Sequence, residues 1–232
     1  MIATRLGWRA FGSSLADLLL PALCPGCEIA AGPPLCPACL AQAEPLVDPC
    51  PWCAAPGGGA QTRCGACDNR GFPHVRRIHV AWVYRGVIER LVGAAKAGGR
   101  APAGRALSRL LPTLTEVTAA LVVPIPPSPG RRSGPHLGTT LARALARQHG
   151  LPLRRLLRLT RLAAEQHRLN HAARARNVAG LFVSRPTPER VLLVDDLMTS
   201  GATASAAAAA LHQAGAKHIE LVCVARTPRA DE

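Results

Sequence analysis

The alternation of apolar and polar positions predicts a parallel α/β sheet in the C-terminal two thirds of the chain. Short, mostly aliphatic or alternating runs are typical of strands, and four are expected, at 78–84, 121–127, 191–194 and 219–225. Patterns of helical period or helix-forming composition lie between them, at 87–97, 137–149 and 202–211. Strands that alternate with helices in this way indicate a Rossmann-like parallel sheet, with Cys223 in its core.

The segment 191–203 combines a buried strand with chemistry suited to a sugar phosphate. Four aliphatic residues are followed by Asp195 and Asp196, and then by a hydroxyl-rich turn that contains Gly201. The free N–H groups of a helix start, a glycine that tolerates positive φ, and nearby hydroxyls form a phosphate cradle at the carboxyl end of a strand. Adjacent carboxylates suit a vicinal diol or a bound magnesium ion, so ribose 5-phosphate fits both halves. An ordinary strand, turn and helix is the structural alternative.

Cysteine spacing dominates the first third. Four Cys-x-x-Cys pairs occur within about 45 residues, where paired thiolates reach one tetrahedral zinc from a tight turn. Neighbouring pairs give two Cys₄ sites, although a crossed arrangement, redox-active pairs or disulfides are alternatives. All eight ligands are cysteine, so both zinc ions are expected to be structural. The first set is Cys24, Cys27, Cys36 and Cys39, and the second is Cys50, Cys53, Cys64 and Cys67.

Composition and charge narrow the class of protein. Hydrophobic residues make up 48% of the 232 residues, which indicates a globular protein, and no apolar stretch near the start reaches the roughly 20 residues of a membrane span. The net charge is +14: residues 1–73 carry −1 and residues 74–232 carry +15, so an anionic partner is expected in the second part. Residues 1–23 are interpreted as an amphipathic helix rather than a signal peptide, and unpaired cysteines favour the cytoplasm.

Cationic positions cluster near predicted loops. Lys96 lies near the end of the helix at 87–97, just before Gly98 and Gly99. This segment is interpreted either as a lid over a polyanion or as an ordinary helix end. Arg131 and Arg132 follow the strand at 121–127 and suit a pyrophosphate group. Nine arginines and one acid lie between residues 143 and 176. This run is consistent with a solvated helix face, a pyrophosphate clamp or a track for a nucleic-acid backbone.

The motif at 191–203 resembles the 5-phosphoribosyl 1-diphosphate (PRPP) motif of type I phosphoribosyltransferases. Together with the cysteine pairs, the whole chain is similar to the ComF family of competence-associated proteins, in which a double zinc ribbon precedes a phosphoribosyltransferase domain. Further matching segments are 82–86 with Lys96 and Gly98, 123–126, Gln166 with Arg174, Asn177, Gly180 and Phe182, and 224–227. The residue patterns divide the chain into an N-terminal helix at 1–23, a cysteine-rich segment at 24–73 and a second domain at 74–232. The resemblance identifies the last two as a double zinc ribbon and a phosphoribosyltransferase-like domain.

The resemblance also implies roles for residues in the second domain. Asp195 and Asp196 would contact the ribose hydroxyls and magnesium-bound diphosphate, while Lys96, Arg131 and Arg132 would stabilise the leaving pyrophosphate. The 5-phosphate would be held by Thr199, Ser200, Gly201, Ala202 and Thr203. Two departures lie elsewhere: the stretch 133–138 lacks the Arg-Gly-Phe-Asn-Gln of relatives, and Ala163 replaces a usual threonine.

Three functions are compatible with these features. The first is transfer of phosphoribosyl from PRPP, although no general base for an acceptor is evident in the sequence. The second, implied by the family, is handling of single-stranded DNA with competence proteins at the inner face of the membrane. Arginines support this, but only Trp82, Tyr84 and Phe182 are aromatic after residue 73, which leaves few rings for base stacking. The third is a regulator that binds PRPP without turnover.

Overall fold

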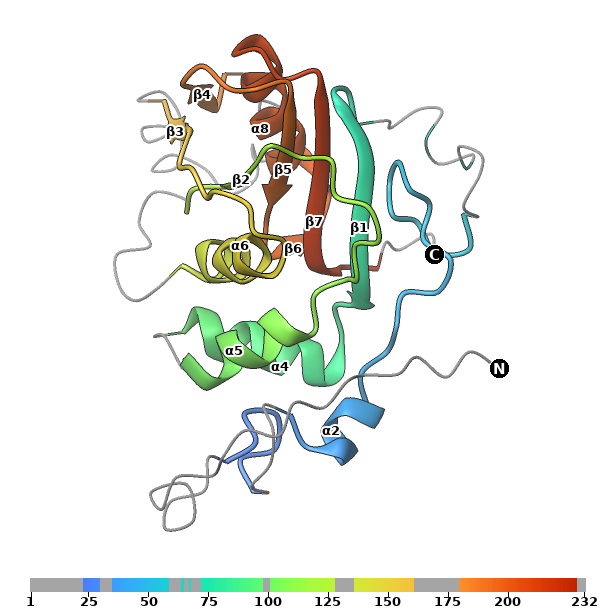
Figure 1. Cartoon of the computed structure of the whole chain (residues 1–232). Helices are drawn as coiled ribbons and strands as arrows, with labels where there is room; N and C mark the ends of the chain where they lie inside the picture. The colour runs from blue at the N-terminus through green and yellow to red at the C-terminus, as the bar shows by residue number, and fades with distance from the viewer. Residues whose placement is uncertain are drawn as a thin grey trace, which may run out of the picture.

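The computed structural model describes residues 23–29, 35–58, 64, 67, 72–97, 101–127, 136–160 and 180–228. Its centre is a parallel sheet with strand order β1-β7-β5-β2 (Figure 1), and the short β6 also pairs with β7. The strands are β1 (Val75–Val83), β2 (Leu121–Pro124), β5 (Arg190–Val194), β6 (Leu197–Met198) and β7 (His218–Arg226). The predicted parallel α/β sheet is therefore confirmed.

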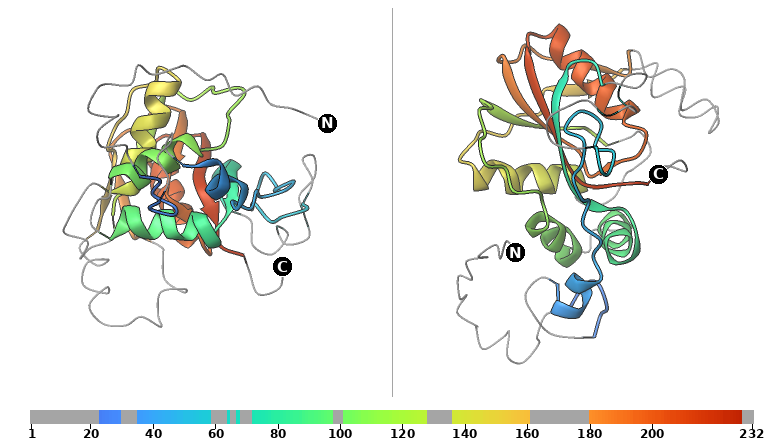
Figure 2. Two further views of the ribbon diagram at one scale, coloured as in Figure 1. Left: turned by 90° about the horizontal axis from the view of Figure 1, so that it is seen from below. Right: turned by 90° about the vertical axis from the view of Figure 1, so that its right-hand side faces the viewer.

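Helices cover both faces of this sheet, as Figure 2 shows. On one face, the helices and the first cysteine segment share a hydrophobic core, while α8 fills the core on the other face. The first group is α4 (Gly86–Lys96), α5 (Ala101–Arg109) and α6 (Leu137–Gln148), whereas α8 spans Ala202–Gln213. The strand residues Val122, Leu192 and Val222 are buried, because both of their faces are covered.

Two elements differ from the sequence prediction for identifiable reasons. β1 begins three residues early, at Val75, because it pairs with β7 across a register shift that leaves Arg76 and Arg77 both exposed. The helix α5 carries proline and glycine, which are poor helix formers in isolation. Its small residues Ala103 and Gly104 are buried where the helix packs between α4 and α6, so tertiary contact stabilises it.

A small antiparallel pair lies beside α8. β3 (Leu157–Leu159) pairs with β4 (Phe182–Ser184), and Phe182 packs into the core below α8. β3 contains Arg158, so part of the arginine-rich run is strand rather than helix. The predicted helix at 1–23, the Gly98–Gly99 turn, Arg131, Arg132, Ala163 and Gln166 lie outside the described residues, apart from Leu23.

The cysteine-rich segment is fastened to the sheet. The backbone of residues 44–51 runs along the outer edge of β1, where Val83 donates to Glu44 O at 3.0 Å, Leu46 donates to Ala81 O at 2.9 Å, and Ile78 donates to Pro51 O at 2.6 Å. Figure 1 shows this segment rising beside β1 from the short helix α2 (Pro37–Ala41). These bonds satisfy backbone groups that an open edge strand would leave exposed.

Candidate functional site

The acid pair lies where β5 ends, as the sequence predicts. Asp195 donates its N–H to Val222 O at 3.0 Å, and the N–H of Asp196 donates to Asp195 Oδ1 at 2.9 Å. The chain then continues as β6 beside the end of β7 before it turns into the glycine loop. Asp195 is half-buried and Asp196 is buried, and both lie at the carboxyl end of the sheet.

Lys96 reaches the acid pair from a distant helix. Its Nζ lies 2.6 Å from Asp196 Oδ1, although 100 residues separate the two in sequence. The helix α4 ends at Lys96, and this end points towards the end of β5 because α4 packs against the sheet through Val87, Ile88 and Leu91. The structure therefore pairs Lys96 with one of the two carboxylates, Asp196, whereas the resemblance assigns Lys96 to the leaving pyrophosphate.

Burial and repulsion act on Asp195. Burial, and next the negative charge of Asp196, raise the pKa of Asp195 to about 7, while the N–H of Asp196 and the charge of Lys96 lower it only in part. A cation or a ribose hydroxyl that reached this carboxylate would replace lost hydration. The pair is thus suited to a ligand that brings positive charge or hydrogen-bond donors.

The predicted phosphate loop has the backbone expected of an anion cradle. Gly201 is the residue before α8 and has φ of +75°, a left-handed conformation that favours glycine. Ala202 donates its N–H to Ser200 Oγ at 3.4 Å, and Thr199, Ser200 and Thr203 are exposed to solvent. The first turn of α8 contains no acidic residue, so the helix dipole favours an anion at this end.

Phe72 packs directly on this loop, which the sequence does not reveal. A Cβ atom added to Gly201 would overlap the ring of Phe72. Phe72 also packs against the second cysteine cluster, so it links that cluster to the phosphate loop. A lone phenylalanine five residues after Cys67 carries no pattern from which this contact could be predicted.

The altered stretch before α6 also approaches the acid pair. A Cβ atom on Gly138 would lie 3.9 Å from Asp195 Oδ1, so the end of this stretch is not remote from the ribose-phosphate half. Beside it, a cavity of about 420 Å³ lies between the end of β2, α6 and the approach to β3. The lining residues are Pro124, Pro126, Pro127, His136, Thr139, Thr140, Arg143, Arg155 and Leu157. Two members of the arginine-rich run thus line a cavity at the carboxyl end of the sheet.

Two groups of four cysteines form at the N-terminal side, each from neighbouring pairs. Within each group the four sulfur atoms lie within 4.8 Å of one another, which excludes the crossed arrangement. In the second group, Cys50 Sγ is 3.4 Å from Cys67 Sγ, and Cys64 Sγ is 3.6 Å from Cys67 Sγ. A tetrahedral zinc with bonds of about 2.3 Å separates its sulfur ligands by about 3.8 Å, so both donor sets fit zinc.

Backbone N–H groups prepare one thiolate in each group. Burial alone would raise the pKa of Cys24, but N–H groups of Cys36 and Gly26 lower it to about 6. Burial would likewise raise the pKa of Cys50, but hydrogen bonds from the backbone N–H groups of Cys64 and Trp52 lower it to about 6. Metal binding needs thiolates, so these contacts favour it.

The first cysteine group is packed on α4. A Cβ atom on Gly26 would lie 3.0 Å from Val87 Cγ2, and Arg90 Nε donates to Gly26 O at 3.3 Å. Cys24 and Cys39 are buried in the same core as α4. The first group therefore contacts α4, which carries Lys96, and the second group reaches the phosphate loop through Phe72.

A parallel sheet with an acid pair and a glycine-containing phosphate loop at the end of a central strand is the architecture of a phosphoribosyltransferase-type domain. In agreement, the model of the family described as phosphoribosyl transferase domain matches residues 137–232. Within the part of the chain that the structure describes, no helix has the length and apolar character of a membrane span.

Relatives extend the similarity into the cysteine-rich segment. The chain is 31% identical over 193 residues to the DNA utilization protein YhgH of Escherichia coli strain K12, which covers 77% of this chain and 84% of that protein. The protein of the same name from Salmonella typhi is 30% identical over 193 residues, which again cover 77% of this chain and 84% of that protein. With its two Cys₄ groups ahead of the phosphoribosyltransferase domain, the chain belongs to the ComF family.

Proposed function

We propose that this chain binds PRPP, or ribose 5-phosphate, with magnesium at residues 195–203, and that it serves the uptake and handling of DNA in natural competence. The observation that carries the first part is the acid pair at the end of β5 directly before the Gly201 turn. The relatives' printed name, DNA utilization protein, supports the second part.

The ribose-phosphate half of the ligand has a partner for each group. The carboxylates of Asp195 and Asp196 accept hydrogen bonds from the two ribose hydroxyls. The 5-phosphate lies at the start of α8, where the N–H groups, the helix dipole and the exposed hydroxyls of residues 199–203 act together. Several weak donors share this binding, so the loss of one hydroxyl is mild.

The diphosphate half is cationic. Lys96 neutralises Asp196 in the free protein, and it is close enough to turn towards a diphosphate once the ligand occupies the acid pair. Arg131 and Arg132 follow β2 in sequence. The cavity at the end of β2 is lined by two further arginines, Arg143 and Arg155. Magnesium bound with PRPP would supply charge neutralisation of the diphosphate, and the oxygen donors of Asp195 and Asp196 are of the kind it prefers.

Transfer would follow from the same arrangement. The bond between the ribose C1 atom and the diphosphate oxygen breaks, pyrophosphate leaves with that electron pair, and the acceptor forms a bond to C1. This chain's contribution is to fix the ribose phosphate and to stabilise the departing charge with Lys96, Arg131 and Arg132. A regulator that binds PRPP without this step uses the same contacts.

Two zinc ions are part of the proposal and have a structural role. The first cysteine group packs on α4, and the second reaches the phosphate loop through Phe72, so zinc would hold both elements in place. Apart from Cys64 and Cys27, which are half-buried, the ligands are buried, and no open coordination position for catalysis is needed.

Calorimetric titration tests PRPP binding. Wild-type protein with magnesium should bind PRPP, more tightly than ribose 5-phosphate if the cations reach the diphosphate, and Asp195→Ala with Asp196→Ala should bind neither. Exchange of labelled pyrophosphate into PRPP then separates a transferase from a regulator. Absence of PRPP binding by wild-type protein would leave a phosphoribosyltransferase fold without the ligand.

Single-stranded DNA binding without a PRPP role is the second candidate. It is favoured by the charge of +14 and by exposed arginines at 154, 155 and 158 around β3. Such binding would depend mainly on phosphate contacts and would weaken steeply with salt.

A further inference from the structure

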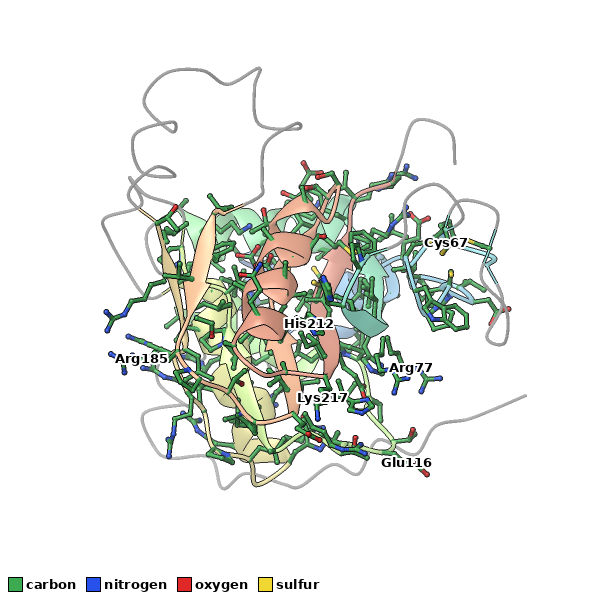
Figure 3. All side chains as sticks on the ribbon, turned by 90° about the horizontal axis from the view of Figure 1, so that it is seen from above. Cys67, Arg77, Glu116, Arg185, His212 and Lys217 are labelled. Atoms are coloured by element: carbon green, nitrogen blue, oxygen red, sulfur yellow. The ribbon has the colours of Figure 1, made fainter. Side chains whose placement is uncertain are left out.

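A second cavity of about 420 Å³ lies away from the acid pair, where the segment that enters β1 meets the end of α8 and the second cysteine group. Figure 3 looks onto this end of the molecule, with His212, Lys217 and Arg77 towards the viewer and Cys67 to the side. The lining residues, which we call the ring pocket, are Trp52, Phe72, Pro73, His74, Val75, Arg76, His212 and Lys217. Its volume is within the range of about 300–1,000 Å³ that is usual for small-ligand sites.

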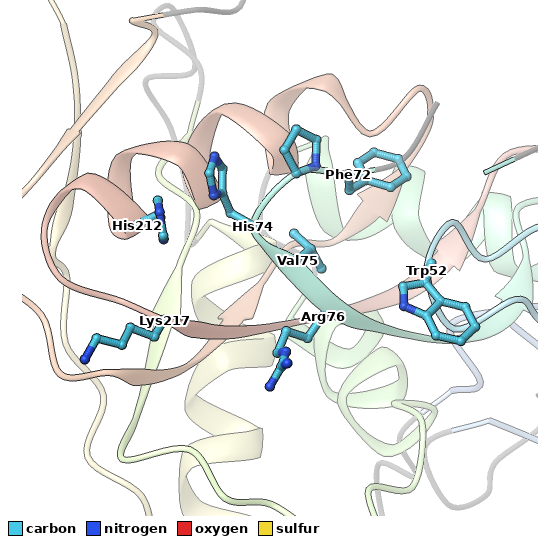
Figure 4. Close-up of a pocket in the computed structure, with 8 residues that line it drawn as sticks. Trp52, Phe72, His74, Val75, Arg76, His212 and Lys217 are labelled. Carbon is cyan, nitrogen blue, oxygen red and sulfur yellow. The ribbon is translucent and has the colours of Figure 1, made fainter. Parts of the chain in front are cut away.

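The side chains of the ring pocket sort into two kinds, as Figure 4 shows. Four carry planar rings and two are cations, while Pro73 and Val75 add apolar surface, and no acidic residue is among them. Phe72, His74 and His212 lie along α8, and Arg76 and Lys217 lie on the opposite side of the pocket (Figure 4). Rings beside cations suit a ligand that is itself a flat ring joined to an anion.

Several of these groups are held in place by contacts within the protein. The rings of His74 and His212 stack with centroids 4.1 Å apart and an interplanar angle of 21°. His212 Nδ1 lies 2.9 Å from Ala216 O, which can only accept, so Nδ1 carries the proton. Arg76 Nη1 lies 2.7 Å from His218 Nδ1, so the guanidinium has a fixed neighbour and further N–H groups to donate.

The remaining cation is available to an anion at little cost. Lys217 pairs with Glu189, and the side chains of both are about two-thirds exposed, at 67% and 60%. Ion pairs that are this exposed contribute little to stability, so a phosphate can compete for the ammonium group. A phosphate between Arg76 and Lys217 would have donors from two different strands, β1 and the approach to β7.

We propose that the ring pocket is a second ligand site that takes a nucleotide unit, with its base against the rings and its phosphate between Arg76 and Lys217. The site goes beyond the proposed PRPP function and does not depend on it. The pocket also supplies rings for base stacking, which are few in the C-terminal domain. The fold brings Trp52 and Phe72 from the cysteine-rich segment to the cations of that domain. The nucleotide unit could be a free nucleoside monophosphate or part of a single strand.

Phe72 gives this site a physical connection to the first. Its ring lines the pocket and packs on Gly201 of the phosphate loop. A base stacked in the pocket therefore lies one side chain away from the cradle for the 5-phosphate.

The test uses the whole chain with its metal, deoxyadenosine monophosphate, and a short single-stranded oligodeoxynucleotide, with the same sequence as duplex for comparison. Arg76→Gln with Lys217→Gln should weaken binding of whichever probe binds, and Trp52→Leu with His74→Ala should weaken it by about tenfold or more, since one stacked base contributes about 1–3 kcal/mol. Arg77→Gln is the matched control, because Arg77 is the exposed neighbour of Arg76 and does not line the pocket. Metal content and thermal unfolding confirm that each variant is folded.

The outcomes are distinct from those of the PRPP experiment. If the pocket variants lose binding of both deoxyadenosine monophosphate and the single strand, the pocket is a mononucleotide site. If they lose binding of the single strand alone, the pocket is part of a strand-binding surface. The Asp195→Ala, Asp196→Ala protein should retain this binding, and the pocket variants should retain PRPP binding. The proposal is overturned if neither probe binds, if the pocket variants bind as tightly as Arg77→Gln, or if the acid pair is what the probes need.

Discussion

At the scale of single residues, Gly201 and Asp195 show how the site constrains its own sequence. Gly201 combines a left-handed backbone with a ring packed against its Cα, so two independent reasons exclude a side chain there. Asp195 is kept in a position where its ionised form is disfavoured. The position of Asp195 reduces the stability of the free protein, and that of Gly201 reduces tolerance of substitution. Such costs are typical of sites where a ligand binds.

Gly201→Ala should lower both stability and affinity for a phosphate ester. A left-handed backbone costs a non-glycine residue about 1–2 kcal/mol, and the overlap with Phe72 adds to this. Gly150→Ala is the control, since Gly150 has a similar φ of +64° and open space around a Cβ, so it should show the backbone cost alone. Chemical denaturation measures the stability of both variants. If Phe72 matters, Phe72→Ala should recover part of the loss in Gly201→Ala, and additive effects would contradict the contact.

Asp195→Asn should stabilise the free protein at high pH. The folded-state pKa of about 7 lies above the ordinary 3.8, so folded Asp195 keeps a proton that the unfolded chain has released. Stability therefore falls as pH rises between these two values, and the full cost is present above pH 7. Thermal unfolding without magnesium or ligand should show a gain in melting temperature for Asp195→Asn at about pH 8 and little gain at about pH 4. A gain of equal size at both values, or in exposed Glu116→Gln, would argue against this cause.

At the scale of elements, the cysteine groups act as supports for the sheet and its loops. The first is packed on α4 and the second on Phe72, and the segment between them covers the edge of β1. Loss of either metal should therefore affect more than the local turn.

Cys24→Ser and Cys64→Ser should each release one zinc ion of two and destabilise the protein. Structural zinc contributes on the order of 10–16 kcal/mol to the folding of small modules, of which the packing against the sheet can retain only a part. Elemental analysis of freshly purified, reduced protein gives the metal content, and hydrogen exchange locates the loosened elements. Cys223→Ser, at a buried cysteine outside both groups, should leave two zinc ions. A wild-type protein without zinc would remove the prediction.

At the scale of the whole molecule, the chain holds two candidate ligand regions. The acid pair, the phosphate loop and the cavity with Arg143 and Arg155 lie where strands end, whereas the ring pocket lies beside the start of β1 and the end of α8. Arg154, Arg155 and Arg158 around β3 are also exposed. A long anion could contact several of these surfaces at once.

Replacing Arg154, Arg155 and Arg158 together with glutamine should lower affinity for single-stranded DNA and reduce the slope of its salt dependence. All three side chains are exposed, so their loss removes phosphate contacts without disturbing the core. Filter binding across a salt series measures both quantities, and the folded state is checked by zinc content. Binding and slope equal to those of wild type would mean that these arginines form only a solvated surface.

Local patterns in the sequence were sufficient for several of the elements and for the site's chemical groups. The strands at 121–124 and 190–194, the helix α6, and both cysteine groups follow from burial period, helix propensity and ligand spacing, all of which involve near neighbours. Asp195, Asp196 and the Gly201 turn follow for the same reason. These are properties that a few consecutive residues determine.

Tertiary structure alone decided how these parts meet. Lys96 contacts Asp196, Phe72 packs on Gly201, and Trp52 shares a pocket with Lys217, all across large sequence separations. No local pattern encodes such contacts, because each depends on strand order and on the edge along which residues 44–51 run. The sequence by itself determined a phosphoribosyltransferase-type domain behind two Cys₄ groups, and the packing of the chain determined that those groups support the site.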